Sequence, residues 1–368
     1  MANPPASAPV ASTQQPTEAL PPMVASGQID QPLEAVAPQE LEHEIDTDGD
    51  SALSSGRASS TASVTSSILE YRKFKGRSYL SECHESDYPI PLDERTLENF
   101  DIMHHFLTLL LDDKLYLAPV KDNVQKVLDV GTGTGIWTID YADQHPNTAV
   151  IGTDLSAVQP EWIPPNLKFE IDDCTKPWTW DENTFDFVHM RYLFGAIRNW
   201  TALFKEAYNA VKPGGWVESC ESEPMTHSDD GTITNDGSTA LGGTWDNMFI
   251  ESGKITGASL SVLTEDLQMK AMKDAGFMDI QEAFYKVPFG SWPKDPKMAE
   301  IGQYAKLSLE SDLVGYSQLI WHEVLKWPAD EYQVFLMQVR KDLKNKKLHP
   351  YFKVRFVWGR KPEEGETK

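Results

Sequence analysis

Cysteine, basic residues and long apolar runs are all scarce in this chain of 368 residues. Its three cysteines, Cys83, Cys174 and Cys220, are far apart and lack CxxC spacing, which argues against a disulfide scaffold or a zinc module. Lysine and arginine total 33 against 56 acidic residues, and the resulting net charge of −23 disfavours direct nucleic-acid binding because phosphates are repelled. No apolar run approaches the roughly 18 residues of a membrane span. We see no basic region followed by an apolar one, the pattern that marks a secretion signal. We therefore expect a cytoplasmic or nuclear protein that has no metal site and no membrane contact.

Aromatic residues are missing from the first 66 positions, where proline, alanine, glutamine, serine and threonine dominate. Arg57 is the only lysine or arginine in this acidic stretch. Such a segment cannot bury enough apolar surface to offset its ordering entropy, so we predict a disordered tail over 1–66. Apolar residues at helical spacing predict a helix over 94–117. We assign 67–122 to an N-terminal helical cap, 123–362 to the main domain and 363–368 to a disordered C-terminus.

The main domain alternates between predicted strands and helices. Such alternation predicts a parallel, doubly wound α/β sheet that binds its ligand at the carboxyl ends of the strands. Two segments do not fit this pattern: 223–257 is glycine-rich and irregular, and 292–349 is a helical insertion. In enzymes that are built on such a sheet, insertions at the strand ends form lids over the substrate. Strands are predicted at 126–130, 149–153, 167–171, 185–189, 216–220, 280–287 and 351–358, and helices at 136–144, 200–211 and 262–275.

A glycine loop follows the first predicted strand and gives the strongest signal of a binding site. Gly131, Gly133 and Gly135 occupy alternate positions, which lets a ligand lie against the backbone and the free N–H groups of the next helix. The dinucleotide fingerprint GxGxxG requires glycine where Ile136 stands, and a phosphate-binding GK[ST] is absent, so a nicotinamide oxidoreductase is disfavoured. The loop by itself is compatible with many ligands.

Acidic residues end the next two predicted strands. Asp154 is placed to accept the hydroxyls of a ribose, or alternatively to cap the following helix. Asp172 and Asp173, followed by Cys174, can receive an adenine amino group, or can form a solvated turn. In series with the glycine loop, these acids predict one elongated nucleoside site.

These motifs together resemble those of class I S-adenosylmethionine-dependent methyltransferases. The matching pieces, in the family's order and spacing, are VLDVGTGTG (127–135), VIGTDLS (150–156), FEIDDC (169–174), FDFVHMRYL (185–193) and VKPGGWVES (211–219). Finer features are similar to the fungal LaeA-like regulators of secondary metabolism. These are the acidic, serine-rich head, KGRSY (75–79), MHH (103–105) and LYLAP (115–119).

The resemblance implies a Rossmann-like sheet of seven mostly parallel strands in the order 3-2-1-4-5-7-6. The last strand to pair is antiparallel, helices cover both faces, and a helical lid is inserted. It implies S-adenosylmethionine as the cofactor and methyl transfer to an unidentified acceptor, either a small molecule or a protein. Asp129 would orient the loop or the methionine ammonium, Leu155 would pack on adenine, and Arg77 and Tyr79 would close over the cofactor carboxylate or only dock the N-terminal segment. The implied cofactor-binding residues are Arg77, Tyr79, Asp129, Gly131, Thr132, Gly133, Gly135, Asp154, Leu155, Asp173 and Cys174.

His189 ends the fourth predicted strand and is the candidate catalytic residue. Its pKa range suits a general base, and the alternative is a histidine that shapes the floor of the acceptor pocket. The aromatic residues of the two insertions either wall an apolar acceptor pocket or form ordinary helix core; they are Trp245, Phe249, Trp292, Tyr304, Trp321 and Trp327. The resemblance also leaves a second function open, a regulatory subunit that binds the cofactor and protein partners without needing turnover.

Overall fold

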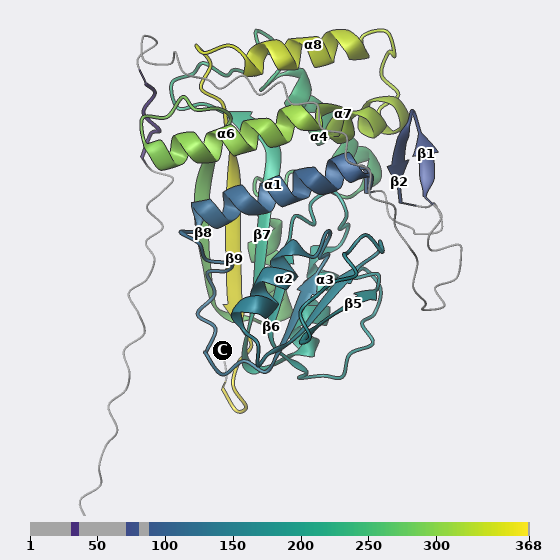
Figure 1. The fold of residues 1–368 in the computed structure, drawn as a ribbon, viewed down its shortest axis with the longest axis vertical. Helices are drawn as coiled ribbons and strands as arrows, with labels where there is room; N and C mark the ends of the chain where they lie inside the picture. The colour runs from purple at the N-terminus through teal and green to yellow at the C-terminus, as the bar shows by residue number, and fades with distance from the viewer. Residues whose placement is uncertain (1–30, 37–70, 81–87, 367–368) are drawn as a thin grey trace, which may run out of the picture.

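The computed structural model describes residues 31–36, 71–80 and 88–366 (Figure 1). The predictions for 1–30, 37–66 and 367–368, which include most of the expected disordered tail, lie outside the described residues. Within the described residues, no helix has both the length and the apolar character that crossing a membrane requires.

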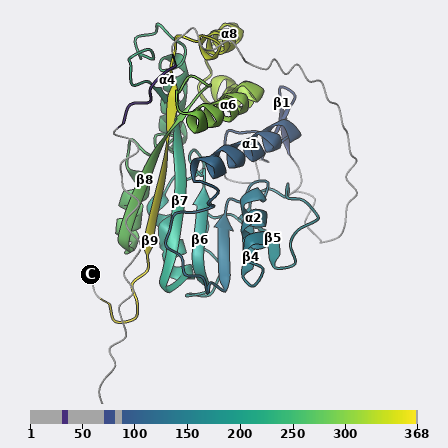
Figure 2. The same cartoon turned by 60° about the vertical axis from the view of Figure 1, so that its left-hand side comes forward.

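A seven-stranded sheet forms the centre of the molecule, with the strand order β5-β4-β3-β6-β7-β9-β8 (Figure 1, Figure 2). Strands β3 to β7 run parallel, and β9 is antiparallel to both of its neighbours. Counted along the chain, this is the order 3-2-1-4-5-7-6 with one reversed strand, so the predicted topology is confirmed. The strands are β3 (Lys126–Val130), β4 (Ala149–Asp154), β5 (Leu167–Ile171), β6 (Phe185–Arg191), β7 (Val211–His227), β8 (Met278–Pro288) and β9 (Tyr351–Arg360).

Successive residues of the central strands pack against opposite helical layers. Val127 of β3 joins a buried cluster with Trp137 of α2 (Ile136–Gln144), whereas its neighbour Leu128 joins a second cluster with Phe204 of α3 (Trp200–Ala210). Side chains alternate between the two faces of a strand, and both faces of this sheet are covered. That double burial explains why its strands are nearly continuous apolar runs. Helix α1 (Glu94–Leu110) lies on the α2 side, and α5 (Leu267–Ala275) on the α3 side.

The predicted helical insertion is confirmed and forms a layer beyond the carboxyl edge of the sheet (Figure 1). It contains α6 (Pro296–Ser311), α7 (Leu313–Leu319), the π-helical turn η1 (Ile320–Val324) and α8 (Tyr332–Leu343). The other insertion was expected to be irregular, but β7 extends into it and it contains α4 (Thr244–Thr256). Helix α4 packs Trp245 and Phe249 with Trp321 and Phe335 in a third buried cluster. These four aromatic residues therefore form helix core, and Trp245 and Phe249 also line a small cavity.

Two helix boundaries differ from the prediction for a backbone reason. The helix expected over 94–117 ends at Leu110, because Asp112 and Asp113 adopt φ angles of 54° and 64°. The helix expected from 262 begins at Leu267, directly after Asp266 with φ 57°. Left-handed backbone cannot continue a right-handed helix.

Part of the predicted tail is ordered against the main domain. Within 31–36, Ala35 forms an antiparallel bridge with Pro293, and Val36 donates from its N–H to the Trp292 carbonyl oxygen at 2.8 Å. Leu33 donates from its N–H to Asp229 at 2.9 Å. The backbone groups of these six residues thus find partners in both insertions. At the other end, Glu366 accepts from Arg360 at 2.9 Å, within the predicted disordered C-terminus.

Candidate functional site

A cavity of about 160 Å³ opens where β3 and β4 end at the carboxyl edge of the sheet. One wall is formed by the glycine loop and by the segments that follow β4 and β5. The opposite wall comes from the N-terminal segment, from α1, from the stretch after β6 and from α7. The lining residues are Leu80, Tyr88, Ile90, Leu92, Phe100, Met103, Gly131, Thr132, Gly133, Thr134, Ile136, Thr153, Asp154, Leu155, Ser156, Asp172, Cys174, Arg191, Tyr192, Leu193, Phe194, Ala196 and Tyr316.

Glycine is required at the three loop positions for different structural reasons. All three have positive φ, at 70°, 57° and 81° for Gly131, Gly133 and Gly135. A Cβ at Gly131 would come within 2.4 Å of Leu193, and one at Gly135 within 2.4 Å of Phe169, so neither position has room for a side chain. A Cβ at Gly133 would meet only Phe100, at 3.8 Å. Gly133 therefore leaves open space in the cavity, whereas Gly131 and Gly135 allow close packing.

Asp129 lies beneath the loop, away from the cavity. Its carboxylate accepts hydrogen bonds from His189 Nδ1 and Thr138 Oγ1, both at 2.7 Å. Burial alone would raise the pKa of Asp129, but the hydrogen bonds from His189, Thr138 and Thr132 bring it below its ordinary value. Of the two roles implied for Asp129, orienting the loop is the one that these contacts support.

His189 does not reach the floor of the cavity, contrary to expectation. It is 1% exposed, and its ring stacks on Trp137 with 3.7 Å between centroids and 3° between planes. Burial lowers its pKa despite the contact with Asp129. The reason is strand register: Asp129 and His189 are direct partners on β3 and β6, so both side chains lie on the α2 face. This buried imidazole contacts Asp129 and Trp137 and does not line the cavity.

Asp154 both braces the loop and lines the cavity. Its carboxylate accepts from the N–H groups of Gly133 at 2.8 Å and Ser156 at 2.9 Å. Burial raises its pKa. Asp154 lines the cavity, as a ligand contact requires, but it caps no helix, because none begins among the described residues 155–166 between β4 and β5; its carboxylate instead holds Gly133 of the loop and the turn at Ser156.

The next acidic pair divides its roles differently from the prediction. Asp172 and Cys174 line the cavity, whereas Asp173 does not. Asp173 instead accepts from the N–H of Thr175 at 2.9 Å and from its hydroxyl at 2.6 Å, in a local turn. Burial raises the pKa of Cys174 to about 12, so its thiol is neutral.

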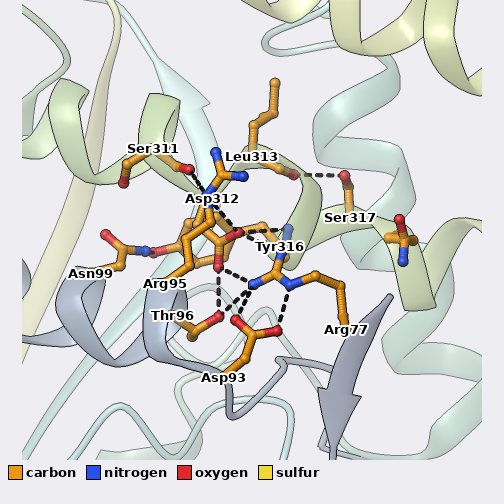
Figure 3. Close-up of polar contacts among 12 residues, drawn as sticks. Arg77, Asp93, Arg95, Thr96, Asn99, Ser311, Asp312, Leu313, Tyr316 and Ser317 are labelled. Carbon is orange, nitrogen blue, oxygen red and sulfur yellow. Dashed lines mark hydrogen bonds and ion pairs between the residues drawn. The ribbon is translucent and has the colours of Figure 1, made fainter. Parts of the chain in front are cut away.

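Arg77 and Tyr79 dock the N-terminal hairpin of β1 (Arg72–Phe74) and β2 (Arg77–Tyr79) and do not line the cavity. Figure 3 shows the Arg77 guanidinium between Asp93, at the start of α1, and Asp312, at the start of α7. It donates to Asp93 at 2.6 Å and to Asp312 at 2.7 Å. Tyr79 is 2% exposed and packs edge-on against Phe74. The docking alternative is thus the one that the structure supports for both residues.

Several cavity residues were not identified from the sequence. Arg191 ends β6 inside the motif FDFVHMRYL, and its Nη1 lies 3.2 Å from Nδ1 of His104. A cationic side chain at the carboxyl end of a strand, such as Arg191, is a sequence signal that could have indicated a ligand contact. Met103 belongs to the MHH stretch but received no role, Tyr316 belongs to no motif, and the two meet only in the fold: the Tyr316 hydroxyl donates to Met103 Sδ at 3.4 Å and accepts from Asn99 at 2.7 Å.

A buried carboxyl group holds the stretch after β6 in the cavity wall. Glu221 accepts from the N–H groups of Leu193 and Phe194, both at 3.0 Å, and burial raises its pKa to about 8. Among the described residues, no cluster of histidine, cysteine and carboxylate side chains has the arrangement of a metal site.

Comparison with known proteins gives consistent matches. Residues 103–282 match the family described as a methyltransferase domain. The chain is 35% identical over 308 residues to the methyltransferase pytC of Aspergillus terreus, which covers 83% of this chain and 92% of that protein. It is 33% identical over 283 residues to the secondary metabolism regulator LAE1 of Cochliobolus heterostrophus, covering 75% and 91%. It is 28% identical over 295 residues to the protein-methionine methyltransferase laeA of Emericella nidulans, covering 80% and 77%.

Proposed function

Because the chain belongs to the class I S-adenosylmethionine-dependent methyltransferases, among relatives that include LaeA-like regulators, we propose that it catalyses methyl transfer from that cofactor. The observation that carries this proposal is the cavity itself. The glycine loop, Asp154 and Asp172 follow three adjacent strands and line one continuous space. A Cβ at Gly133 would project into that space, which is the expected property of a backbone cradle for a ligand.

The cavity residues fit the parts of the cofactor in order. We assign the methionine part to the backbone of Gly131, Thr132 and Gly133, and the ribose hydroxyls to Asp154. The adenine amino group falls to Asp172 in place of Asp173, since only Asp172 lines the cavity. Leu155 and Cys174 line the same end and supply packing surface.

Arg191 is the cation that we assign to the cofactor's carboxylate, in place of Arg77. It lines the cavity, whereas Arg77 is engaged by Asp93 and Asp312. A guanidinium carries five N–H donors in a fork that suits a carboxylate. Only one of its nitrogens faces His104, at 3.2 Å, so donors are left for a ligand.

The chemistry divides between cofactor and protein. S-adenosylmethionine, when bound, supplies a methyl group that its sulfonium already activates. The chain's residues hold the acceptor in line with that methyl group and exclude water. Tyr192, Leu193 and Phe194 form the wall at which an acceptor must arrive, and Glu221 fixes the backbone of the latter two.

A regulatory function without turnover is the second candidate, because a relative at 33% identity is named a secondary metabolism regulator. In that case the bound cofactor would stabilise a surface for protein partners. We also propose that the protein resides in the cytoplasm or the nucleus, as the low cysteine content predicts.

Cofactor binding separates the site assignment from a mere likeness of fold. Isothermal titration of the full chain with S-adenosylhomocysteine should show binding, and Gly133→Val should abolish it by filling the cavity. Gly237→Val is the matched control, because Gly237 also has positive φ, 84°, and nothing lies within 4 Å of its Cβ position. Undiminished binding in Gly133→Val would refute the assignment. Transfer of labelled methyl groups to a screened acceptor then distinguishes the enzyme from the regulator.

A further inference from the structure

A second cavity, of about 80 Å³, adjoins the first. Ile90, Met103, Phe194 and Tyr316 line both cavities, so the two spaces share a wall. The remaining lining comes largely from the two insertions and includes Trp245 and Phe249 of α4 and Ala305, Ser308 and Leu309 of α6. The second cavity therefore lies between the insertions, where the lid arrangement places an acceptor.

The shared wall is fixed from three parts of the chain. Tyr316 of α7 is hydrogen-bonded to Asn99 and Met103 of α1, at 2.7 and 3.4 Å. Phe194 is held through its backbone N–H by Glu221 of β7 at 3.0 Å. Such fixed contacts define where a molecule in the second cavity meets the first.

The lining of the second cavity is almost wholly apolar. Among the described residues that line it, only Ser222, Glu223, Ser308 and the Tyr316 hydroxyl are polar, and no lysine, arginine or histidine is present. A space above about 10–15 Å³ can hold water only where polar partners are available. At about 80 Å³ with few partners, this cavity suits an apolar occupant better than a polar one.

Glu223 is the one charged group among the described residues of that lining. It is 2% exposed, and its carboxylate accepts from the Thr264 N–H at 3.0 Å and from the Thr264 hydroxyl at 2.9 Å, with His227 Nε2 at 3.9 Å. Burial would raise its pKa, but the neighbouring His227 and the hydrogen bonds from Thr264 lower it below the ordinary value, so the group is ionised at neutral pH. A carboxylate has about four acceptor positions, and the neighbours of Glu223 leave at least one of them for a donor on a bound molecule. The negative charge of the same carboxylate repels an anion.

We propose that the second cavity is the acceptor site, and that the acceptor is an uncharged, mainly apolar small molecule with one hydrogen-bond donor directed at Glu223. This inference rests on the proposed function. The acceptor's heteroatom supplies the electron pair of the new bond to the methyl carbon, the sulfur keeps the pair of the bond that breaks, and the acceptor's proton passes to the Glu223 carboxylate that accepts its hydrogen bond.

Two naphthalene derivatives of similar size provide the test. 1-Naphthol is neutral with one donor, and 1-naphthoate is an anion with the same rings. Each is titrated into the full chain, first alone and then with saturating S-adenosylhomocysteine, whose own binding is measured beforehand. We expect 1-naphthol to bind in both conditions and 1-naphthoate to bind at least about tenfold more weakly. Glu223→Gln should narrow that difference by weakening 1-naphthol and strengthening 1-naphthoate.

Cavity-filling variants locate the probe. Ala305→Phe, and independently Ser308→Leu, should weaken 1-naphthol by about tenfold or more, with S-adenosylhomocysteine binding retained. Leu307→Phe is the matched control on the same helix, because Leu307 is 48% exposed and does not line the cavity; it should change neither affinity. Circular dichroism confirms that each variant is folded.

The outcomes separate the two levels of proposal. If S-adenosylhomocysteine fails to bind, the proposed function fails whatever the probes do. If it binds but 1-naphthol does not, or binds equally well to the filled variants, the acceptor assignment alone is overturned. Preference for 1-naphthoate overturns the role of Glu223, and methylation of a protein side chain in place of any small molecule overturns the acceptor class.

Discussion

Replacing Arg77 by methionine should destabilise the cap over the cavity without touching a cofactor contact. The guanidinium joins three segments that are far apart in the sequence: the hairpin, α1 through Asp93 and Thr96, and α7 through Asp312 (Figure 3). Methionine keeps the length of the apolar stem and removes every donor. The Asp312 side chain then stays buried, at 1% exposed, without a close ion pair. The Arg95 guanidinium approaches it only to 3.8 Å.

The structure sets the size of the effect. Breaking a buried ion pair by removing one partner costs about 3–5 kcal/mol. Asp312 keeps hydrogen bonds from Thr96 Oγ1 at 2.6 Å and from the Gly315 N–H at 3.1 Å, which places the loss at the lower end, about 3 kcal/mol. The double variant Arg77→Met/Asp312→Asn should recover part of it, because the unpaired charge is gone.

Urea unfolding measures this loss, and Arg72→Met is the matched control in the same hairpin. The Arg72–Glu323 pair is exposed, with side chains 34% and 44% accessible at 3.5 Å, so its loss should cost about 0–1 kcal/mol. Equal losses in the two variants would refute the reasoning. If Arg77→Met instead left stability unchanged and weakened S-adenosylhomocysteine binding, Arg77 would be a cofactor ligand after all.

The sheet and the glycine loop could be predicted because their signals are local. Each central strand is a short apolar run closed by a turn, and the loop carries its glycines in consecutive alternate positions. Strand order came from the family resemblance, since single strands such as β8 and β9 contain nothing that specifies which neighbour they pair with. Helix α4 has apolar residues at Trp245, Met248 and Phe249, a helical spacing that the surrounding glycines obscured.

The other wall of the cavity could not be predicted, because its contacts join distant segments. Tyr316 meets Met103 across 213 positions, and Arg77 meets Asp312 across 235. No local pattern records such a contact. His189 shows a different failure, since it lies two residues before the end of β6 and its side chain faces away from the cavity. In register with Asp129 on the neighbouring strand, it lies on the face that α2 covers.

Three further measurements test other parts of the molecule. Asp154→Ala should weaken S-adenosylhomocysteine binding by about 1–3 kcal/mol in titration calorimetry, the scale of a hydrogen bond to a charged group, whereas a loss near zero would make Asp154 only a brace for the loop. Deleting residues 1–36 should leave that affinity unchanged but lower the unfolding free energy by about 1–2 kcal/mol, for the backbone hydrogen bonds of 31–36; unchanged stability would contradict the docking.

The last test concerns pH. Burial raises the pKa of Glu218 to about 7 and of Glu221 to about 8, from 4.5. An acid whose pKa is higher in the folded chain binds more protons when folded, so its stabilising contribution is complete below about pH 4.5 and is lost as the pH rises to the folded value. Each pKa unit is worth about 1.4 kcal/mol, so the unfolding free energy should fall by about 2–3 kcal/mol between pH 6.5 and 8.5. Glu221→Gln should flatten most of that decline, because it removes the group that titrates over the upper part of the range. A wild-type chain that is equally stable at both pH values would show that the backbone N–H groups of Leu193 and Phe194 compensate fully for the burial of the charge.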